Sequence, residues 1–93
     1  MIRAVGERLE VEAPMTLATA SVLLAAGIAA FADGPTVFDL SRVAEVDSSG
    51  LAVVFAWQRA ARERGASIRV VNPPPNLLSL AEVYGVADLV PLA

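Results

Sequence analysis

The segment from Thr36 to Glu63 changes from a strand pattern to a helix pattern at Asp47, and this change constrains the fold more than any other feature. Residues Thr36–Leu40 are mostly apolar, with β-branched and aromatic side chains, as in a strand that is covered on both faces. From Leu51 onward the apolar spacing is helical. A buried strand, a loop and a sharp helix entry are therefore expected.

Asp47 and Ser48 are the natural N-cap candidates of that helix. Aspartate and serine side chains accept hydrogen bonds from the free N–H groups of a first helical turn. The same position places a serine hydroxyl at the positive end of a helix, where added negative charge is favoured. A structural cap and a phosphate-accepting switch are thus both compatible with these residues.

The composition indicates a small domain with more apolar residues than its own core can cover. The chain has 93 residues, of which 56% are hydrophobic, and its mean hydropathy is +0.61. Soluble domains usually contain about 45–50% apolar residues, and small domains bury a small share of their surface. Part of the apolar surface is therefore expected to face a partner.

Charge and cysteine content exclude several classes of protein. The net charge is −3, and the seven basic residues are scattered arginines without the basic stripe of a nucleic-acid-binding protein. No cysteine is present, so a disulfide framework is excluded. Charged residues interrupt Met1–Arg8 before an apolar core forms, unlike a signal peptide. A cytoplasmic location is expected.

Strands and helices alternate along the chain. The expected strands are Ile2–Val5, Arg8–Glu12, Thr36–Leu40 and Ser67–Val71; the expected helices are Thr16–Ala32, Ser48 or Ser49 to about Arg64, and Leu77–Tyr84, before a partial helix within Val86–Leu92 that covers the sheet. This order implies right-handed crossovers and a mostly parallel sheet, and one hairpin makes the sheet mixed. The fold class is α/β: residues 1–93 form a single domain with four strands and helices mainly on one face.

The segment Ala13–Ala32 contains no charge, so a membrane span has to be considered. Its Ala, Thr and Ser content favours instead a helix that packs on the sheet. Four large side chains define the stripe that would face the sheet, while Val22 and Leu23 would be partly exposed; the stripe is Leu17, Leu24, Ile28 and Phe31.

The helix that follows Asp47 offers a second candidate surface. At 100° per residue, Leu51 and Val54 face the sheet, while Val53 and Trp57 lie on an adjacent arc. Trp57 could lie at the edge of the core. Alternatively, Val53 and Trp57 form an apolar docking patch, since Trp is enriched where proteins bind each other.

The available side chains are poorly suited to catalysis. The chain has no His, Cys or Lys, which removes the usual general bases and most activated nucleophiles. No glycine-rich phosphate loop and no cluster with metal-ligand spacing is present. We therefore expect no catalytic residue, no metal site, no cofactor and no enzymatic activity.

The run Val37–Ser41 together with Val46–Leu51 resembles the core of STAS domains, which include the bacterial anti-sigma factor antagonists. The expected order of elements is similar over nearly the whole chain. In those antagonists an anti-sigma kinase phosphorylates the serine directly after the Asp, which corresponds to Ser48. Ser49 and Gly50 complete the motif.

A narrower resemblance is to the MlaB subfamily, the cytoplasmic STAS subunits of a phospholipid-transport ABC complex that maintains outer-membrane lipid asymmetry. It depends on Asp39–Val43, on the Asp47 motif followed by Leu51-Ala52, and on Leu80–Gly85. In that subfamily a hydroxyl residue at the Ser48 position lies at the contact with the ATPase subunit. The Ser48-Ser49 pair departs from this pattern toward that of the antagonists.

The resemblance implies a non-enzymatic adaptor that binds the ATPase subunit of a phospholipid-transporting ABC complex at the inner face of the inner membrane. The alternative is an anti-sigma factor antagonist switched by phosphorylation of Ser48. A stand-alone lipid- or nucleotide-binding domain has no support beyond the surplus hydrophobicity. The expected partner-binding residues are Asp47, Ser48, Ser49, Gly50, Leu51, Val53 and Trp57.

Overall fold

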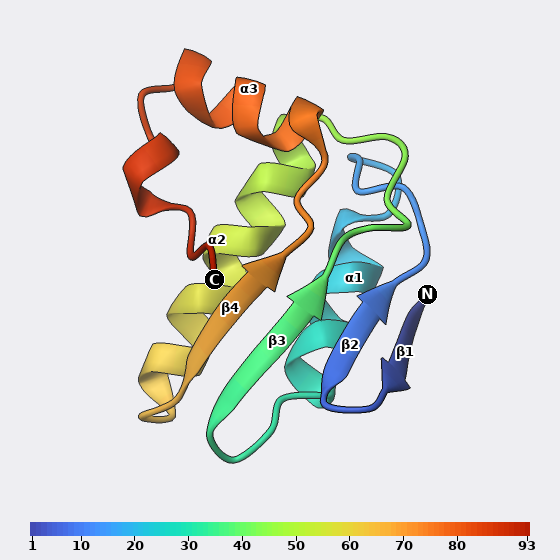
Figure 1. Ribbon diagram of the computed structural model, residues 1–93, viewed down its shortest axis with the longest axis vertical. Coiled ribbons are helices and arrows are strands. Elements are labelled where there is room, and N and C mark those ends of the chain that lie inside the picture. The colour runs from blue at the N-terminus through green and yellow to red at the C-terminus, as the bar shows by residue number, and fades with distance from the viewer.

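The computed structural model describes residues 1–93 as a four-stranded sheet with helices packed against it (Figure 1). The strands lie in the order β1-β2-β3-β4. The elements are β1 (Ile2–Val5), β2 (Arg8–Val11), α1 (Ala20–Ala29), β3 (Pro35–Asp39), α2 (Ser48–Glu63), β4 (Ser67–Val71), α3 (Pro75–Val83) and a short 3₁₀ helix, η1 (Ala87–Leu89).

The sheet is mixed, which confirms the predicted α/β class. Strands β1 and β2 form an antiparallel hairpin, and Gly6 in its turn has a φ of 60°, which glycine adopts without strain. Strand β3 pairs in parallel with β2 and with β4, with Phe38 opposite Leu9 and Val70. The turns that follow β2, β3 and β4 therefore lie at the same end of the sheet.

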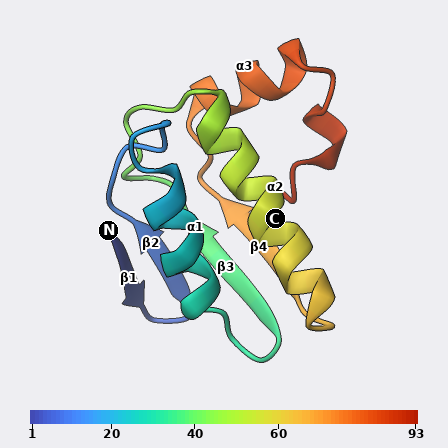
Figure 2. The same cartoon turned by 180° about the vertical axis from the view of Figure 1, so that it is seen from behind.

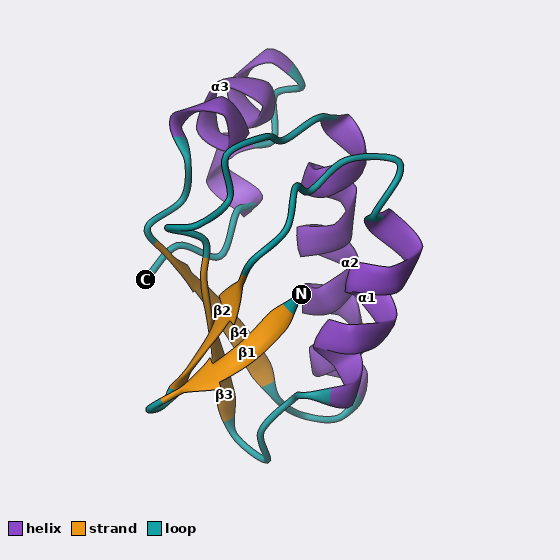
Figure 3. Ribbon diagram, turned by 90° about the vertical axis from the view of Figure 1, so that its right-hand side faces the viewer, coloured by secondary structure: helices purple, strands orange, loops and turns teal.

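Helices α1 and α2 lie side by side on one face of the sheet (Figure 2). The opposite face is not covered by any helix, and α3 lies beyond the end of the strands (Figure 3). The uncovered face carries ion pairs between neighbouring strands and the loop after β3. Arg3 pairs with Glu10 and Glu12, Arg42 pairs with Glu10, and Arg8 pairs with Asp39.

The core lies between the sheet and the helix pair, and Trp57 is at its centre. Its ring stacks on Phe38 of β3, with ring centroids 4.0 Å apart and planes within 3° of parallel. The indole N–H donates to the carbonyl oxygens of Leu23 and Leu24 on α1, at 3.2 Å each. A Cβ at Gly27 would collide with the indole ring, so the absence of a side chain there lets α1 approach.

The expected docking patch of Val53 and Trp57 is therefore wrong, because both side chains are buried. The arc was correctly placed beside the sheet-facing side of the helix. However, α1 packs on that arc and covers it, and this contact between two helices cannot be inferred from the periodicity of α2 alone.

The first helix is shorter than expected, and its buried face differs. Residues Thr16–Thr19 form a turn in which the Thr19 hydroxyl donates to the carbonyl of Pro14 at 2.6 Å, and the helix begins only at Ala20. Leu17 thus precedes the helix and is 77% exposed, whereas Leu23 is fully buried. No helix of the chain is both long and apolar enough to span a bilayer.

The C-terminal segment lies along the edge of the sheet rather than over it. Leu92 forms a parallel bridge with Val70, and the Val70 N–H donates to the carbonyl of Pro91 at 2.8 Å. This contact covers the β4 edge, which would otherwise offer unpaired backbone groups to another chain.

Trp57→Ala is expected to lower the free energy of unfolding by about 3–5 kcal/mol, because it leaves a cavity between Phe38 and α1. Urea unfolding measures the loss. The exposed Leu17→Ala change should stay within about 0.5 kcal/mol and serves as the control. Strong quenching of the wild-type tryptophan fluorescence by acrylamide would contradict the buried position.

Candidate functional site

Asp47 is the N-cap of α2. It was one of the two cap candidates, with Ser48, that the sequence offered. Its Oδ1 accepts hydrogen bonds from the backbone N–H groups of Ser49 at 2.8 Å and Gly50 at 3.3 Å. These donors belong to the first turn of the helix, whose N–H groups have no carbonyl four residues earlier within the helix. Ser48 is therefore the first helical residue and not the cap.

The other oxygen of Asp47 binds a second loop. Asp47 Oδ2 accepts a hydrogen bond from the backbone N–H of Leu17 at 3.1 Å. Met15 forms a parallel bridge with Val46, and the Asp47 N–H donates to the Met15 carbonyl at 3.2 Å. The loops before α1 and α2 are thus joined, and we call Leu17 with Asp47–Ser49 the corner.

Gly50 lets the two loops approach. A Cβ at this position would collide with the backbone carbonyl oxygen and the Cβ of Met15. Because the obstructing atoms belong to the backbone of the joined loop, a rotamer change cannot relieve the contact. The glycine of the motif is therefore required by packing beneath the corner.

Gly50→Ala should reduce the free energy of unfolding by about 1–3 kcal/mol through this overpacking, despite the better helix propensity of Ala. Thermal and urea unfolding measure the effect. The exposed Ala52→Gly change in the same helix, which should cost about 1 kcal/mol by propensity alone, is the comparison. A Gly50→Ala protein more stable than wild type would contradict the close contact.

Asp39 anchors the other end of the loop that leads to the corner. Its buried carboxylate accepts hydrogen bonds from the Ser41 N–H at 2.9 Å and the Asn72 amide at 3.1 Å. Arg8 approaches the second oxygen at 3.4 Å. Asn72 adopts a φ of 52°, a left-handed conformation that Asn tolerates. The chain leaving β3 is therefore fixed to the chain leaving β4.

Both carboxyl groups have a pKa below the ordinary value of 3.8. For Asp47, the largest cause is the hydrogen bond from the Leu17 N–H, and the donors of Ser49 and Gly50 lower the pKa further. For Asp39, burial raises the pKa, but the hydrogen bonds that it accepts lower it more in total.

Acid should therefore destabilise the fold through these two groups. A carboxyl whose pKa is lower in the folded state contributes stability above its unfolded pKa of about 3.8, and this contribution is lost as pH falls through the folded value. Urea unfolding at several pH values should show a decrease below about pH 4. Asp39→Asn should be less stable at neutral pH and show a shallower decrease; parallel curves would contradict its role.

The residues predicted from the sequence divide into exposed and supporting groups. Ser48 is exposed and Asp47 and Ser49 are half-buried, whereas Gly50 and Leu51 are buried beneath them. Leu17 was missed, because it was assigned to the stripe facing the sheet. The signal that could have placed it is Thr19, whose tendency to form turns argues against a helix starting at Thr16.

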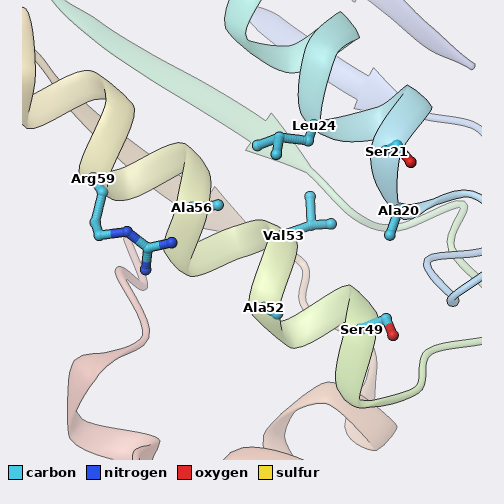
Figure 4. A pocket seen from close by; sticks show the side chains of 8 residues that line it. All are labelled: Ala20, Ser21, Leu24, Ser49, Ala52, Val53, Ala56 and Arg59. Carbon is cyan, nitrogen blue, oxygen red and sulfur yellow. The ribbon is translucent and has the colours of Figure 1, made fainter.

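An open groove of about 410 Å³ runs between α1 and α2 next to the corner (Figure 4). The side chains at its edges are mostly small, Leu24 and Val53 lie between the two helices, and Arg59 stands at one end. The groove is lined by Ala20, Ser21, Leu24, Ser49, Ala52, Val53, Ala56 and Arg59. Ser49 belongs to both the groove and the corner.

A family model with the description MlaB, STAS domain matches residues 2–91. The chain belongs to this STAS family. A curated relative, the intermembrane phospholipid transport system binding protein MlaB of Haemophilus influenzae, is 33% identical over 51 residues, which are 55% of this chain and 49% of that protein. The match thus spans about half of the relative's length.

Two solved structures show the same fold. One, a crystal structure assigned to an anti-sigma factor antagonist of Thermotoga maritima, has a TM-score of 0.75 at 13% identity and covers 99% of this chain and 83% of its own. The structure of a protein named Mglu has a TM-score of 0.62 at 20% identity, over 81% of this chain and 20% of its own. At such low identity the likeness concerns the fold alone.

Proposed function

We propose that the chain is a non-enzymatic adaptor that binds the ATPase subunit of a phospholipid-transporting ABC complex through the corner. The exposed Ser48 hydroxyl at the start of α2, beside the exposed Leu17 side chain, is the observation that carries this proposal. The MlaB family model and the name of the Haemophilus influenzae relative support the transport context.

The geometry of the corner suits a docking role. Hydrogen bonds to Asp47 fix the backbone on both sides, so the exposed side chains need little ordering when a partner binds. Leu17 offers apolar area, and Ser48 offers a hydroxyl that can donate and accept. Gly50, Leu51, Val53 and Trp57 contribute from below by holding α2 in place, rather than by contact with the partner.

The chemistry within the chain supports a binding role over catalysis. The corner has no side chain that could deprotonate Ser48 other than the Asp47 carboxylate, whose pKa is lowered and whose two oxygens already accept backbone hydrogen bonds. No group of three or more acidic side chains is placed to hold a metal ion.

An alternative is an anti-sigma factor antagonist, with Ser48 as the phosphoacceptor. It is supported by the exposure of Ser48 at the positive end of α2 and by the fold shared with the Thermotoga maritima protein. A phosphate would add roughly −1.5 to −2 charges there, which the helix end accommodates.

Ser48→Asp should leave the domain folded but abolish partner binding, because a close-packed interface would have to desolvate the added charge. Circular dichroism and pull-down with the ATPase subunit of the transporter are the measurements. Ser67→Asp, an exposed serine at the opposite end of the sheet, is the matched control and should still bind. Because the exposed Ser48 is not the cap, Ser48→Ala should change the free energy of unfolding by no more than about 0.5 kcal/mol.

Intact-mass measurement on protein from its native cells separates the two proposals. Unmodified protein that co-purifies with the membrane ATPase under every growth condition is the expected result. A phosphate on Ser48 whose occupancy changes with growth state would favour the antagonist instead.

A further inference from the structure

The groove between α1 and α2 has the shape of a helix-binding site. Ala20 and Ser21 on α1, and Ala52 and Ala56 on α2, are small enough to let the backbone of another helix come close (Figure 4). Side chains of such a helix could then contact the half-buried Leu24 between the two helices, next to the buried Val53.

The charges around the groove are unbalanced. No charged residue occurs from Ala13 to Ala32, so the α1 side contributes none. On the α2 side, Arg59 lines the groove and Arg62 lies beside it in an adjoining depression. Neither arginine forms an ion pair. On the other face of the sheet Arg3, Arg8 and Arg42 are paired, while Arg69 is not.

This imbalance indicates what the partner carries. In a chain with net charge −3, two arginines without acidic partners beside an uncharged groove would complement a carboxylate. An arginine at the rim of an interface pairs with a carboxylate in a fixed, bidentate geometry, so it also sets the direction of the bound helix. The groove thus has an apolar floor and a cationic end.

We infer that the groove binds one amphipathic helix of the ATPase partner, with apolar side chains toward Leu24 and a carboxylate paired with Arg59. This inference rests on the proposed function, since it names the element by which the same partner is held. Ser49 belongs both to the corner and to the groove, so one partner contacts both surfaces.

The test measures the affinity of the full chain for the purified ATPase subunit of the transporter. Arg59→Glu should weaken binding at least tenfold. Arg59→Lys, which keeps the charge, should reduce the affinity by a smaller factor. Arg69→Glu is the matched control, because Arg69 is an exposed, unpaired arginine on β4 at the uncovered face of the sheet. Its affinity should stay within twofold of wild type.

A charge exchange identifies the occupant. Hydrogen exchange on the ATPase, with and without the adaptor, should show protection in one helical segment that contains an acidic residue. Replacement of that acidic residue by Lys should weaken binding to the wild-type chain. The Arg59→Glu variant should bind this substituted ATPase at least tenfold more tightly than it binds the wild-type ATPase. Protection confined to non-helical segments, or the absence of any rescue, would overturn the inference.

Other outcomes separate this inference from the proposed function. If Ser48→Asp abolishes binding but Arg59→Glu does not weaken it, the groove is not used and the adaptor function stands. If the wild-type chain does not bind the ATPase, the adaptor function fails as well. If Arg59→Glu changes only self-association, measured by light scattering, the occupant of the groove is a second copy of the chain. If it changes only sedimentation with phosphatidylglycerol vesicles, the occupant is a lipid. Either result would overturn the inference that the groove binds a helix of the ATPase.

Discussion

The Asp47 carboxylate is the interaction on which the shape of the corner depends. One oxygen caps α2 and the other binds the backbone of the loop before α1, so a single side chain fixes two segments that are 30 residues apart. Its pKa is lowered chiefly because the carboxylate accepts hydrogen bonds from the N–H groups of Leu17, Ser49 and Gly50, which favour the charged form. Gly50 and the Met15–Val46 bridge allow the approach that these hydrogen bonds need.

The sequence predicted the elements whose signals are local. The strand Ser67–Val71 is identical to β4, and the N-cap, the hairpin and the mixed sheet were predicted from turn residues and alternation. It failed where the outcome depends on contacts between elements. Trp57 is covered by α1 only because Gly27 has no side chain, and no pattern within α2 contains that information.

The same limit applies to the candidate site. The Asp47–Gly50 motif located the corner, since caps depend on neighbouring residues. The groove lies between two helices that the sequence does not place relative to each other. Leu17 could be assigned to the surface only after the turn at Thr16–Thr19 had been recognised, because a residue outside the helix does not follow the periodicity that defines the stripe.

The surplus of apolar residues is not spread evenly over the surface. The uncovered face of the sheet carries charged side chains, and three of its arginines, Arg3, Arg8 and Arg42, form ion pairs within the chain. The helix side is different: α1 exposes Val22, Leu17 lies before it, and the nearby arginines of α2 have no acidic partner. Exposed apolar area next to uncompensated charge is typical of an interaction surface. Exposed apolar side chains also occur on α3 and the C-terminal segment, at Val83, Tyr84, Leu89 and Leu92. Under the proposed function, the partner would dock on the side of α1 and α2, where the corner and the groove meet at Ser49.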